Sequence, residues 1–211
     1  MMPKNRLDEK SLYVGVSILT EADSDLENVI TKFGNPPLWS REPGYSTLVH
    51  IILEQQVSLA SAKAAFNKLK EAVENDLTPE RFLEFSDTEL KNIGFSRQKT
   101  KYCRELSKSL INGDLELDKL EGLDNADARK ELKKIKGIGD WTANIYLLMA
   151  LMRPDVWPSG DLALKKSIQK IKSLPDTPSS ERCDEIASQW KPLRAVAARI
   201  IWHHYLNQPS L

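Results

Sequence analysis

A short glycine-containing segment flanked by lysines has residue types and spacing suited to holding an anion. Residues 132–141 read LKKIKGIGDW, and five basic residues but only one acid lie between Arg129 and Lys136. Glycines allow positive φ and close approach to the backbone, and the exposed amides at the start of a following helix bind anions. A lone Gly-Ile-Gly is most often a helix end and a tight turn, but the flanking lysines favour two helices whose hairpin binds nucleic-acid phosphates. Ile138 is expected to anchor this hairpin in the core.

A carboxylate occupies a second suggestive position. Asp161 follows the tripeptide PSG and begins the predicted helix DLALKKSIQKIK. Taken alone, an Asp at the start of a helix is usually an N-cap, because its side chain accepts hydrogen bonds from the first free amides. Asp140 and Asp155 compete with Asp161 for a functional role, and Asp155 is interpreted as structural.

Helices are expected to position these residues, because nearly every segment has helical periodicity. Residues 125–136 and 140–152 should flank the hairpin, and two further helices should lie near 179–190 and 193–206. Period-2 alternation is not convincing in any segment, although residues 11–19 are read as a short strand or an extended arm. Sequence signals for helix ends occur at Asp23 or Ser24, Gly34, Ser58, Thr78-Pro79 and the capping box that begins at Ser86.

Composition restricts the class of protein. A chain of 211 residues can form one domain or two closely packed lobes. Because the formal net charge is zero, any basic surface must be local. The longest apolar stretch, 145–152, is too short to cross a bilayer. The polar N-terminus resembles no signal peptide, and two distant cysteines without metal-type spacing indicate an intracellular protein with reduced thiols.

Several blocks together resemble the helix-hairpin-helix-GPD superfamily of DNA glycosylases. LKKIKGIGDWTANIYLLMAL resembles the motif that gives the superfamily its name, and DVWPSGDLALKK resembles its Gly/Pro-rich loop that ends in an essential aspartate. LVHIILEQQVSLASAKAAF resembles the helix–loop–helix that carries the DNA wedge. NPPLW and WKPLRAVAARIIWHHYL are similar to the 3-methyladenine DNA glycosylase II branch. The blocks extend from about residue 23 to 206.

The resemblance implies that Asp161 is the catalytic aspartate. Breaking an N-glycosidic bond builds positive charge on the sugar, and a fixed carboxylate can stabilise that charge and orient a water. Bifunctional relatives carry a lysine just after the hairpin, where this chain has Trp141. The resemblance therefore implies hydrolysis without strand cleavage. Two cysteines also exclude the four-cysteine iron–sulfur cluster of those relatives.

The same resemblance implies an aromatic base pocket. Trp141 and Trp202 fall at its pocket positions, Trp39 in the PPLW loop is expected to form another wall, and Tyr146 stands next to Ile145, where a relative has a pocket tyrosine. Electron-rich rings favour a base that alkylation has made cationic. A buried tryptophan can equally be ordinary core.

The DNA contacts are likewise implied by resemblance. The target base must leave the stack, and Gln56, with Val57 and Ser58, is expected to fill the gap, although Glu54 departs from the small residue more usual beside it. The hairpin residues assigned to phosphate are Gly137, Ile138, Gly139, Lys136, Thr142 and Lys134. Backbone carbonyls of Lys133, Ile135 and Ile138 are expected to hold a monovalent Na⁺ or K⁺. Arg97, Lys99 and Lys101 are further candidate DNA contacts, whereas His50 is read as a core or supporting residue.

The sequence therefore predicts an all-α, two-lobed helix-hairpin-helix-GPD fold with its active-site cleft between the lobes. An N-terminal arm, 1–22, should precede a glycosylase domain, 23–211. The wedge lobe should span about 44–125, the hairpin 132–145 and the catalytic loop 155–161, and the C-terminal helices should pack with the N-terminal segment.

The predicted function is monofunctional excision of alkylated purines, of the 3-methyladenine and 7-methylguanine type, from duplex DNA, leaving an abasic site. No catalytic cofactor is expected, and the protein should be a monomer associated with DNA, in the cytoplasm, nucleoid or nucleus. Three alternatives remain. They are a glycosylase of this fold for a neutral deaminated or oxidised base, a non-catalytic DNA-binding module, and a helical protein with no DNA role.

Overall fold

The computed structural model describes residues 6–208, and every regular element in that range is helical. The all-α prediction is confirmed. The chain divides into two compact units: unit 1 comprises Met1–Ser40 and Leu147–Leu211, and unit 2 comprises Arg41–Tyr146.

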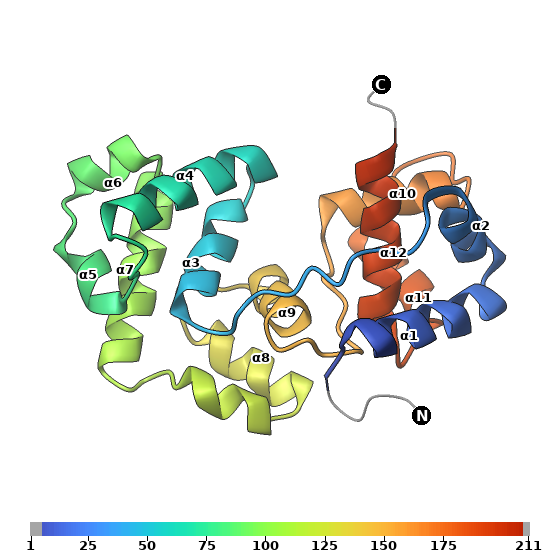
Figure 1. The fold of residues 1–211 in the computed structure, drawn as a ribbon, viewed down its shortest axis with the longest axis horizontal. Helices are drawn as coiled ribbons and strands as arrows, with labels where there is room; N and C mark the ends of the chain where they lie inside the picture. The colour runs from blue at the N-terminus through green and yellow to red at the C-terminus, as the bar shows by residue number, and fades with distance from the viewer. Residues whose placement is uncertain (1–5, 209–211) are drawn as a thin grey trace. The chain divides into compact units, whose positions relative to one another are not determined.

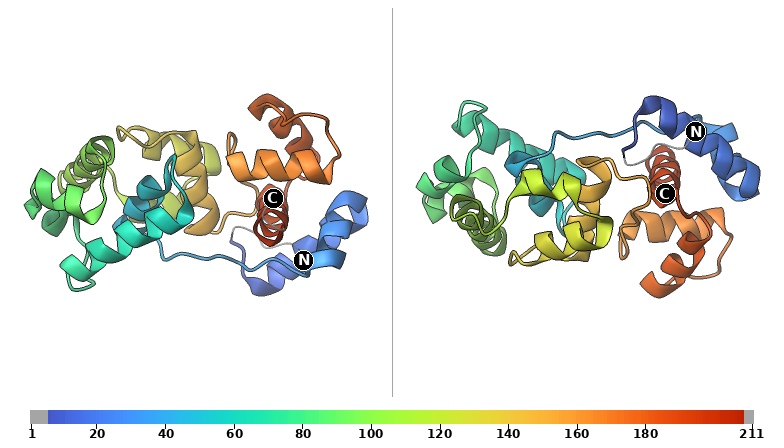
Figure 2. Two further views of the ribbon diagram at one scale, coloured as in Figure 1. Left: turned by 90° about the horizontal axis from the view of Figure 1, so that it is seen from above. Right: turned by 90° about the horizontal axis from the view of Figure 1, so that it is seen from below.

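Unit 1 is built around one helix that is buried on nearly all sides. This helix, α12, packs against the other four helices of the unit, as the neighbouring ribbons in Figures 1 and 2 show. Its run AVAARIIW provides small and branched apolar side chains on every face, which is typical of a central helix. The helices of unit 1 are α1 (Glu9–Ala22), α2 (Ser24–Phe33), α10 (Leu162–Ile171), α11 (Ser180–Ser188) and α12 (Arg194–Asn207).

The predicted strand or extended arm near the N-terminus is wrong. Residues 9–22 form α1, which begins with a capping box between Asp8 and Ser11. Leu12, Val16 and Leu19 are buried along one helical face, whereas the β-branched residues between them made the short apolar run ambiguous. Residues 1–5 of the predicted arm lie outside the described residues.

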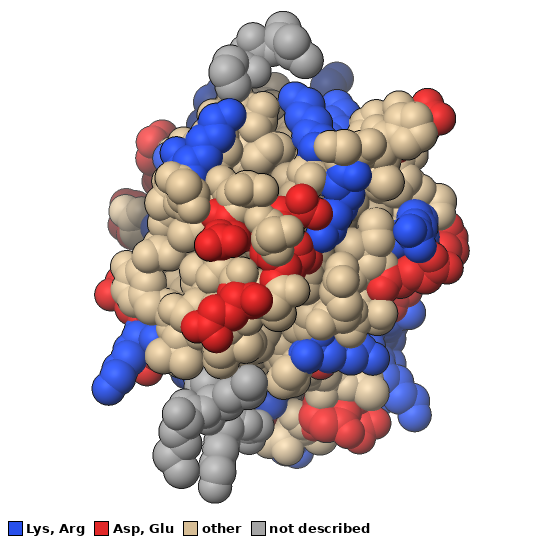
Figure 3. Space-filling view, turned by 90° about the vertical axis from the view of Figure 1, so that its right-hand side faces the viewer, with Lys and Arg blue, Asp and Glu red and all other residues tan. Residues whose placement is uncertain are grey.

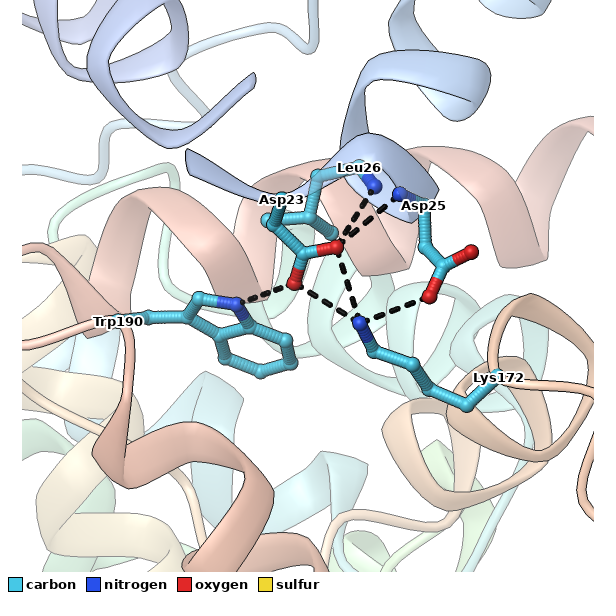
Figure 4. Close-up of polar contacts among 5 residues, drawn as sticks. All are labelled: Asp23, Asp25, Leu26, Lys172 and Trp190. Carbon is cyan, nitrogen blue, oxygen red and sulfur yellow. Dashed lines mark hydrogen bonds and ion pairs between the residues drawn. The ribbon is translucent and has the colours of Figure 1, made fainter. Parts of the chain in front are cut away.

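A polar cluster joins the start of α2 to the end of α10. Asp23 caps α2 by accepting from the backbone amides of Asp25 and Leu26, and it also accepts from Lys172 Nζ and Trp190 Nε1, each at 2.9 Å (Figure 4). Burial alone would raise the pKa of Asp23, but the hydrogen bonds from Lys172 and Trp190 outweigh it, and the pKa is lowered. Lys172 also pairs with Asp25 at 2.9 Å.

Replacing Asp23 by Asn should destabilise the protein more at neutral than at acid pH. Because the folded-state pKa lies below that of the unfolded chain, the carboxylate stabilises the fold fully above the unfolded pKa of about 3.9, and this contribution is lost as the pH falls through the folded pKa. We expect a cost of about 1–3 kcal/mol at pH 7 that shrinks as the pH falls below the unfolded pKa and through the lower folded-state pKa. Urea denaturation at each pH measures it.

The matched control is Asp25→Asn, which removes the more exposed partner of the same lysine and should cost less than about 1 kcal/mol. An Asp23→Asn cost that is equal at both pH values would contradict the prediction.

Unit 2 has a buried helix, α3, packed against α4 and α7, with α5 and α6 also on α7. The apolar residues of TLVHIIL leave α3 with almost no exposed surface. The short helix η1 was not predicted, and it packs against α8. The helices that lie in unit 2 are α3 (Tyr45–Glu54), α4 (Leu59–Ala72), α5 (Pro79–Glu84), α6 (Asp87–Ile93), α7 (Arg97–Ile111), η1 (Leu117–Gly122) and α8 (Asn125–Lys133). The last helix, α9 (Asp140–Met149), begins in unit 2 and ends in unit 1.

The predicted helix starts are largely confirmed. Asp23, Ser58, Thr78 and Asp161 each accept a backbone amide as N-caps, and Ser86 forms the expected capping box with Glu89. The helices around the hairpin are shorter than predicted: the first ends at Lys133 rather than 136, and the second at Met149 rather than 152. The hairpin is therefore a six-residue connection, 134–139.

Candidate functional site

The hairpin between α8 and α9 is anchored in the core by its apolar residues. Ile135 and Ile138 are 5% and 4% exposed, and the Ile138 amide donates to the Ile135 carbonyl at 3.0 Å. The expected anchoring role of Ile138 is confirmed. A hairpin held in this way presents its remaining backbone in a fixed conformation.

The two hairpin glycines have different surroundings. Gly137 has a φ of +100°, and a Cβ at this position would overlap the ring of Tyr102 on α7. A Cβ on Gly139 would meet no atom within 4 Å. The sequence suggested that both glycines make room for an anion. The structure shows instead that the space beside Gly137 is occupied by Tyr102, so only Gly139 borders open space.

Replacing Gly137 by Ala should therefore destabilise the protein by more than about 2 kcal/mol, since the change combines a positive φ with overlap on a ring. Gly139→Ala, two residues away, should change the free energy of unfolding by less than about 1 kcal/mol. Thermal or urea denaturation of both variants provides the comparison. Equal effects of the two substitutions would show that the ring of Tyr102 yields easily.

The lysines of the hairpin have different surroundings. Lys133 Nζ contacts both carboxylate oxygens of Asp140, at 2.7 and 2.8 Å. Lys134 pairs with Glu131 at 2.6 Å. The negative charge of Asp140, which would repel an incoming phosphate, is thus offset by a neighbouring cation. Lys136 is exposed beside Gly137.

Thr142 contributes differently from the prediction. Thr142 is among the hairpin residues predicted to bind phosphate, but the residue is 2% exposed, and its hydroxyl accepts a 2.9 Å hydrogen bond from Gln55 Nε2. A hydroxyl that is buried and already bonded is not placed to contact an external phosphate. Gln55 was not singled out from the sequence, because a glutamine at a helix end usually points into solvent.

Asp161 is held at the start of α10 by two donors. Its Oδ1 accepts from the Leu164 backbone amide at 2.9 Å and from Trp202 Nε1 at 3.1 Å. These contacts fix the carboxylate plane at a helix N-terminus, where negative charge is favoured. Trp202, predicted as a pocket wall, is 7% exposed and directly orients the carboxylate. No local pattern of residues indicates this hydrogen bond, which joins residues 41 positions apart.

The competing carboxylate Asp155 has a structural role, as expected. Arg194 Nε and a terminal nitrogen donate to its two oxygens at 2.7 and 3.0 Å. This paired geometry ties the loop before α10 to the start of α12.

The other residues predicted to line the base pocket, Trp39, Trp141 and Tyr146, differ in their burial and contacts. Trp39 has a φ of +48°, and its ring centroid lies 6.4 Å from that of His203. Trp141 is half-buried in the first turn of α9. Tyr146 is fully buried, and its hydroxyl accepts the Gly44 amide at 3.0 Å. A ring without exposed surface cannot line a pocket for a base in this conformation, so Tyr146 supports the loop before α3 instead.

The predicted wedge lies in the exposed turn between α3 and α4. Gln56 has a φ of +56°, which is rare outside glycine, and Val57 is 44% exposed. Ser58 is exposed and caps α4 by accepting from the Ser61 amide. A strained backbone followed by an exposed apolar residue is typical of a functional turn.

The unexpected acid before this turn is neutralised. Glu54, 9% exposed, accepts from both terminal nitrogens of Arg41 at 2.7 and 3.0 Å. Burial lowers the pKa of His50 despite the nearby Glu54 carboxylate, and its ring stacks on Phe66. Arg41 is therefore the group that offsets the charge, and His50 is the supporting residue that the sequence indicated.

Basic and acidic side chains are interspersed on the face drawn in Figure 3, so that face has no continuous basic patch.

Among residues 6–208, no cluster of three or more His, Cys, Asp or Glu could hold a metal ion. Both cysteines are buried and unbridged. Within the same range, no helix combines the length and apolarity needed to span a membrane.

Comparison with known proteins identifies the family. The family model of the HhH-GPD superfamily base excision DNA repair proteins matches residues 49–192. The chain belongs to this superfamily.

Individual relatives define the branch. The chain is 29% identical over 171 residues to DNA-3-methyladenine glycosylase 1 of Schizosaccharomyces pombe, covering 80% of this chain and 75% of the relative. It superposes with a TM-score of 0.84 on the structure of the S. pombe 3-methyladenine DNA glycosylase Mag1 in complex with abasic DNA, at 27% identity, covering 89% of this chain and 94% of that one.

Some relatives are considerably longer. The chain is 29% identical to the DNA-3-methyladenine glycosylase of Bacillus subtilis and covers 54% of it. It spans 65% of another B. subtilis relative.

Proposed function

We propose that this protein is a monofunctional DNA glycosylase that hydrolyses the N-glycosidic bond of alkylated purines in duplex DNA. The observation that carries the proposal is the orientation of Asp161, whose Oδ1 is held by the Leu164 amide and by Trp202. Membership in the base excision repair superfamily and the names of the relatives support it.

Asp161 would act on the sugar. As the bond to the base lengthens, positive charge develops on the sugar ring, and a carboxylate fixed beforehand stabilises that charge without reorganising. The same carboxylate can orient a water for attack on C1′. An alkylated purine is already cationic and leaves readily, so no strong general acid is needed.

The hydrolytic outcome rests on Trp141. Relatives that cleave the strand use a lysine amine at this position, and an indole cannot form a Schiff base. We therefore expect an intact abasic site as the product. Trp141, Trp202 and Trp39 are electron-rich rings, each of which would favour a cationic base through stacking and cation–π attraction.

The hairpin and the turn after α3 would hold the DNA. Backbone amides around Gly139, with Lys136 and the other hairpin lysines, would contact a phosphate, and Gln56 with Val57 would occupy the space left by the extruded base. A monovalent cation at the carbonyls of Lys133, Ile135 and Ile138 stays a prediction. The Ile135 carbonyl accepts the Ile138 amide and retains a second lone pair. The partner is double-stranded DNA with a damaged base, bound by a monomer.

Base release from methylated duplex DNA tests the function. The protein is incubated with duplex treated with a methylating agent, the released bases are separated by chromatography, and the DNA is run with and without alkali. We expect 3-methyladenine and 7-methylguanine to be released, and strand breaks to appear only after alkali.

Three outcomes would contradict this proposal. Release only from duplexes that carry hypoxanthine, uracil or 8-oxoguanine would indicate a glycosylase for neutral lesions. Binding without release from any duplex would indicate a DNA-binding module. Breaks without alkali would show that another lysine acts as the nucleophile.

A further inference from the structure

Residues 53–55, which end α3 and cap it, are held by three separate contacts within unit 2. The carbonyl of Leu53 accepts from Lys99 Nζ at 2.7 Å. The Glu54 carboxylate is paired with Arg41. Lys99, a candidate DNA contact from the sequence, is thus directed at the end of α3, and burial lowers its pKa.

Gln55 provides the third contact, and it reaches the hairpin. Its Nε2 donates to the Gly137 carbonyl and to Thr142 Oγ1, both at 2.9 Å. Both protons of one amide group are therefore used, and they join two segments more than 80 residues apart in sequence. The first acceptor lies on Gly137, where a Cβ would overlap the ring of Tyr102, and the second lies on a buried residue of α9.

These three contacts involve residues up to Gln55, and the residues that follow it are exposed. The next residue, Gln56, is exposed with a φ of +56°, and Val57 and Ser58 are exposed as well. The turn proposed as the wedge therefore follows directly from a residue that is bonded to the proposed phosphate-binding hairpin.

We propose that Gln55 is a positioning residue that sets the place of the Gln56–Ser58 turn relative to the hairpin. When the hairpin is seated on a backbone phosphate, the two hydrogen bonds fix how far the turn enters the base stack. This inference rests on the proposed function, since it assigns the DNA both to the hairpin and to the turn. Because its amide group bonds to Gly137 and Thr142, Gln55 would act through the turn and not directly on the reacting base or its sugar.

Loss of these hydrogen bonds should affect insertion more than binding. Gln55→Ala should reduce the single-turnover rate of base release at saturating enzyme by about 10- to 100-fold, because small misplacements are costly in a preorganised site. Affinity for undamaged duplex should change by less than about threefold, since phosphate contacts dominate it.

A set of matched variants separates positioning from general structure. Gln55→Glu keeps the shape but cannot donate to the Gly137 carbonyl, so it should behave like Gln55→Ala. Thr142→Val removes one acceptor, whereas Thr142→Ser keeps the hydroxyl and should retain a near wild-type rate. Combining Gln55→Ala with Thr142→Val should add little to the larger single effect. Gln189→Ala, an exposed glutamine at the end of α11, is the control and should leave the rate unchanged.

Insertion of the Gln56–Ser58 turn is measured with 2-aminopurine placed next to a stable abasic-site analogue in a duplex. The fluorescence of 2-aminopurine rises when the base is unstacked. Wild type and Thr142→Ser should raise the signal, and the two Gln55 variants should raise it several-fold less at equal occupancy. Circular dichroism confirms that each variant is folded. If Gln55→Ala does not fold, the rates and fluorescence signals of Gln55→Glu and Thr142→Val are compared with those of wild type instead.

Two results would overturn the inference. One is a wild-type rate and fluorescence signal for the folded Gln55 variants. The other is an equal loss of affinity and of rate, which would place Gln55 in hairpin binding alone. Failure of the proposed function has a different signature: wild type would release no methylated base, and the fluorescence comparison would still decide whether Gln55 positions the turn.

Discussion

Replacing Asp161 by Asn is expected to reduce single-turnover release of 3-methyladenine and 7-methylguanine by on the order of 10²- to 10³-fold or more. The amide oxygen of Asn can still accept from the Leu164 amide and from Trp202, so the start of α10 should keep its structure. What the variant loses is the negative charge that stabilises the developing cation on the sugar. Chromatography of released base, with enzyme in excess over DNA, measures the effect.

The control for this prediction is Asp155→Asn in the same loop. It breaks the pair with Arg194, which is partly exposed. The stability should fall by about 1 kcal/mol, while the rate of base release at 20 °C or below should stay within severalfold of wild type. If Asp161→Asn retained the wild-type rate, the charge at Asp161 would not be the catalytic group.

Replacing Arg199 by Met is expected to destabilise unit 1 by several kcal/mol. Arg199 is fully buried, and its guanidinium donates to the carbonyls of Leu38, Ala195 and Leu148 at 2.8–2.9 Å. Burial lowers the pKa of Arg199 to about 9, which leaves it charged at neutral pH. Met fills part of the volume but leaves the Leu38 and Leu148 carbonyls without these donors, at about 1–3 kcal/mol each, whereas the Ala195 carbonyl lies within α12 and still accepts a backbone amide of the helix.

The summed cost, about 2–6 kcal/mol if the terms add, is a large fraction of the whole stability of a typical domain, about 5–15 kcal/mol. Urea denaturation and the yield of soluble protein report it. The comparison variant is Arg182→Ala, an exposed arginine paired with Glu185, for which a change within about 0.5 kcal/mol is expected. A stably folded Arg199→Met protein, within 1–2 kcal/mol of wild type, would contradict the account.

The rigid hairpin was predicted correctly from the sequence, but the prediction lacked one of the contacts that explain it. The glycine spacing and the lysines indicated a rigid turn between two helices, and Ile138 is anchored as expected. The partner that makes Gly137 indispensable, Tyr102, lies on another helix and 35 positions earlier in the chain. No local pattern reports such a contact, because it depends on how α7 packs beside the hairpin.

The sequence by itself determined the helical class, most helix starts and the position of Asp161, because periodicity, capping residues and glycines act within one or two turns of the chain. Only the tertiary structure decided that Trp202 orients Asp161, that Tyr146 is buried under the loop before α3, and that Gln55 bonds to the hairpin. Each of these contacts joins residues from 41 to 102 positions apart. Their partners are chosen by the packing of whole helices against one another, which no local pattern of residues specifies.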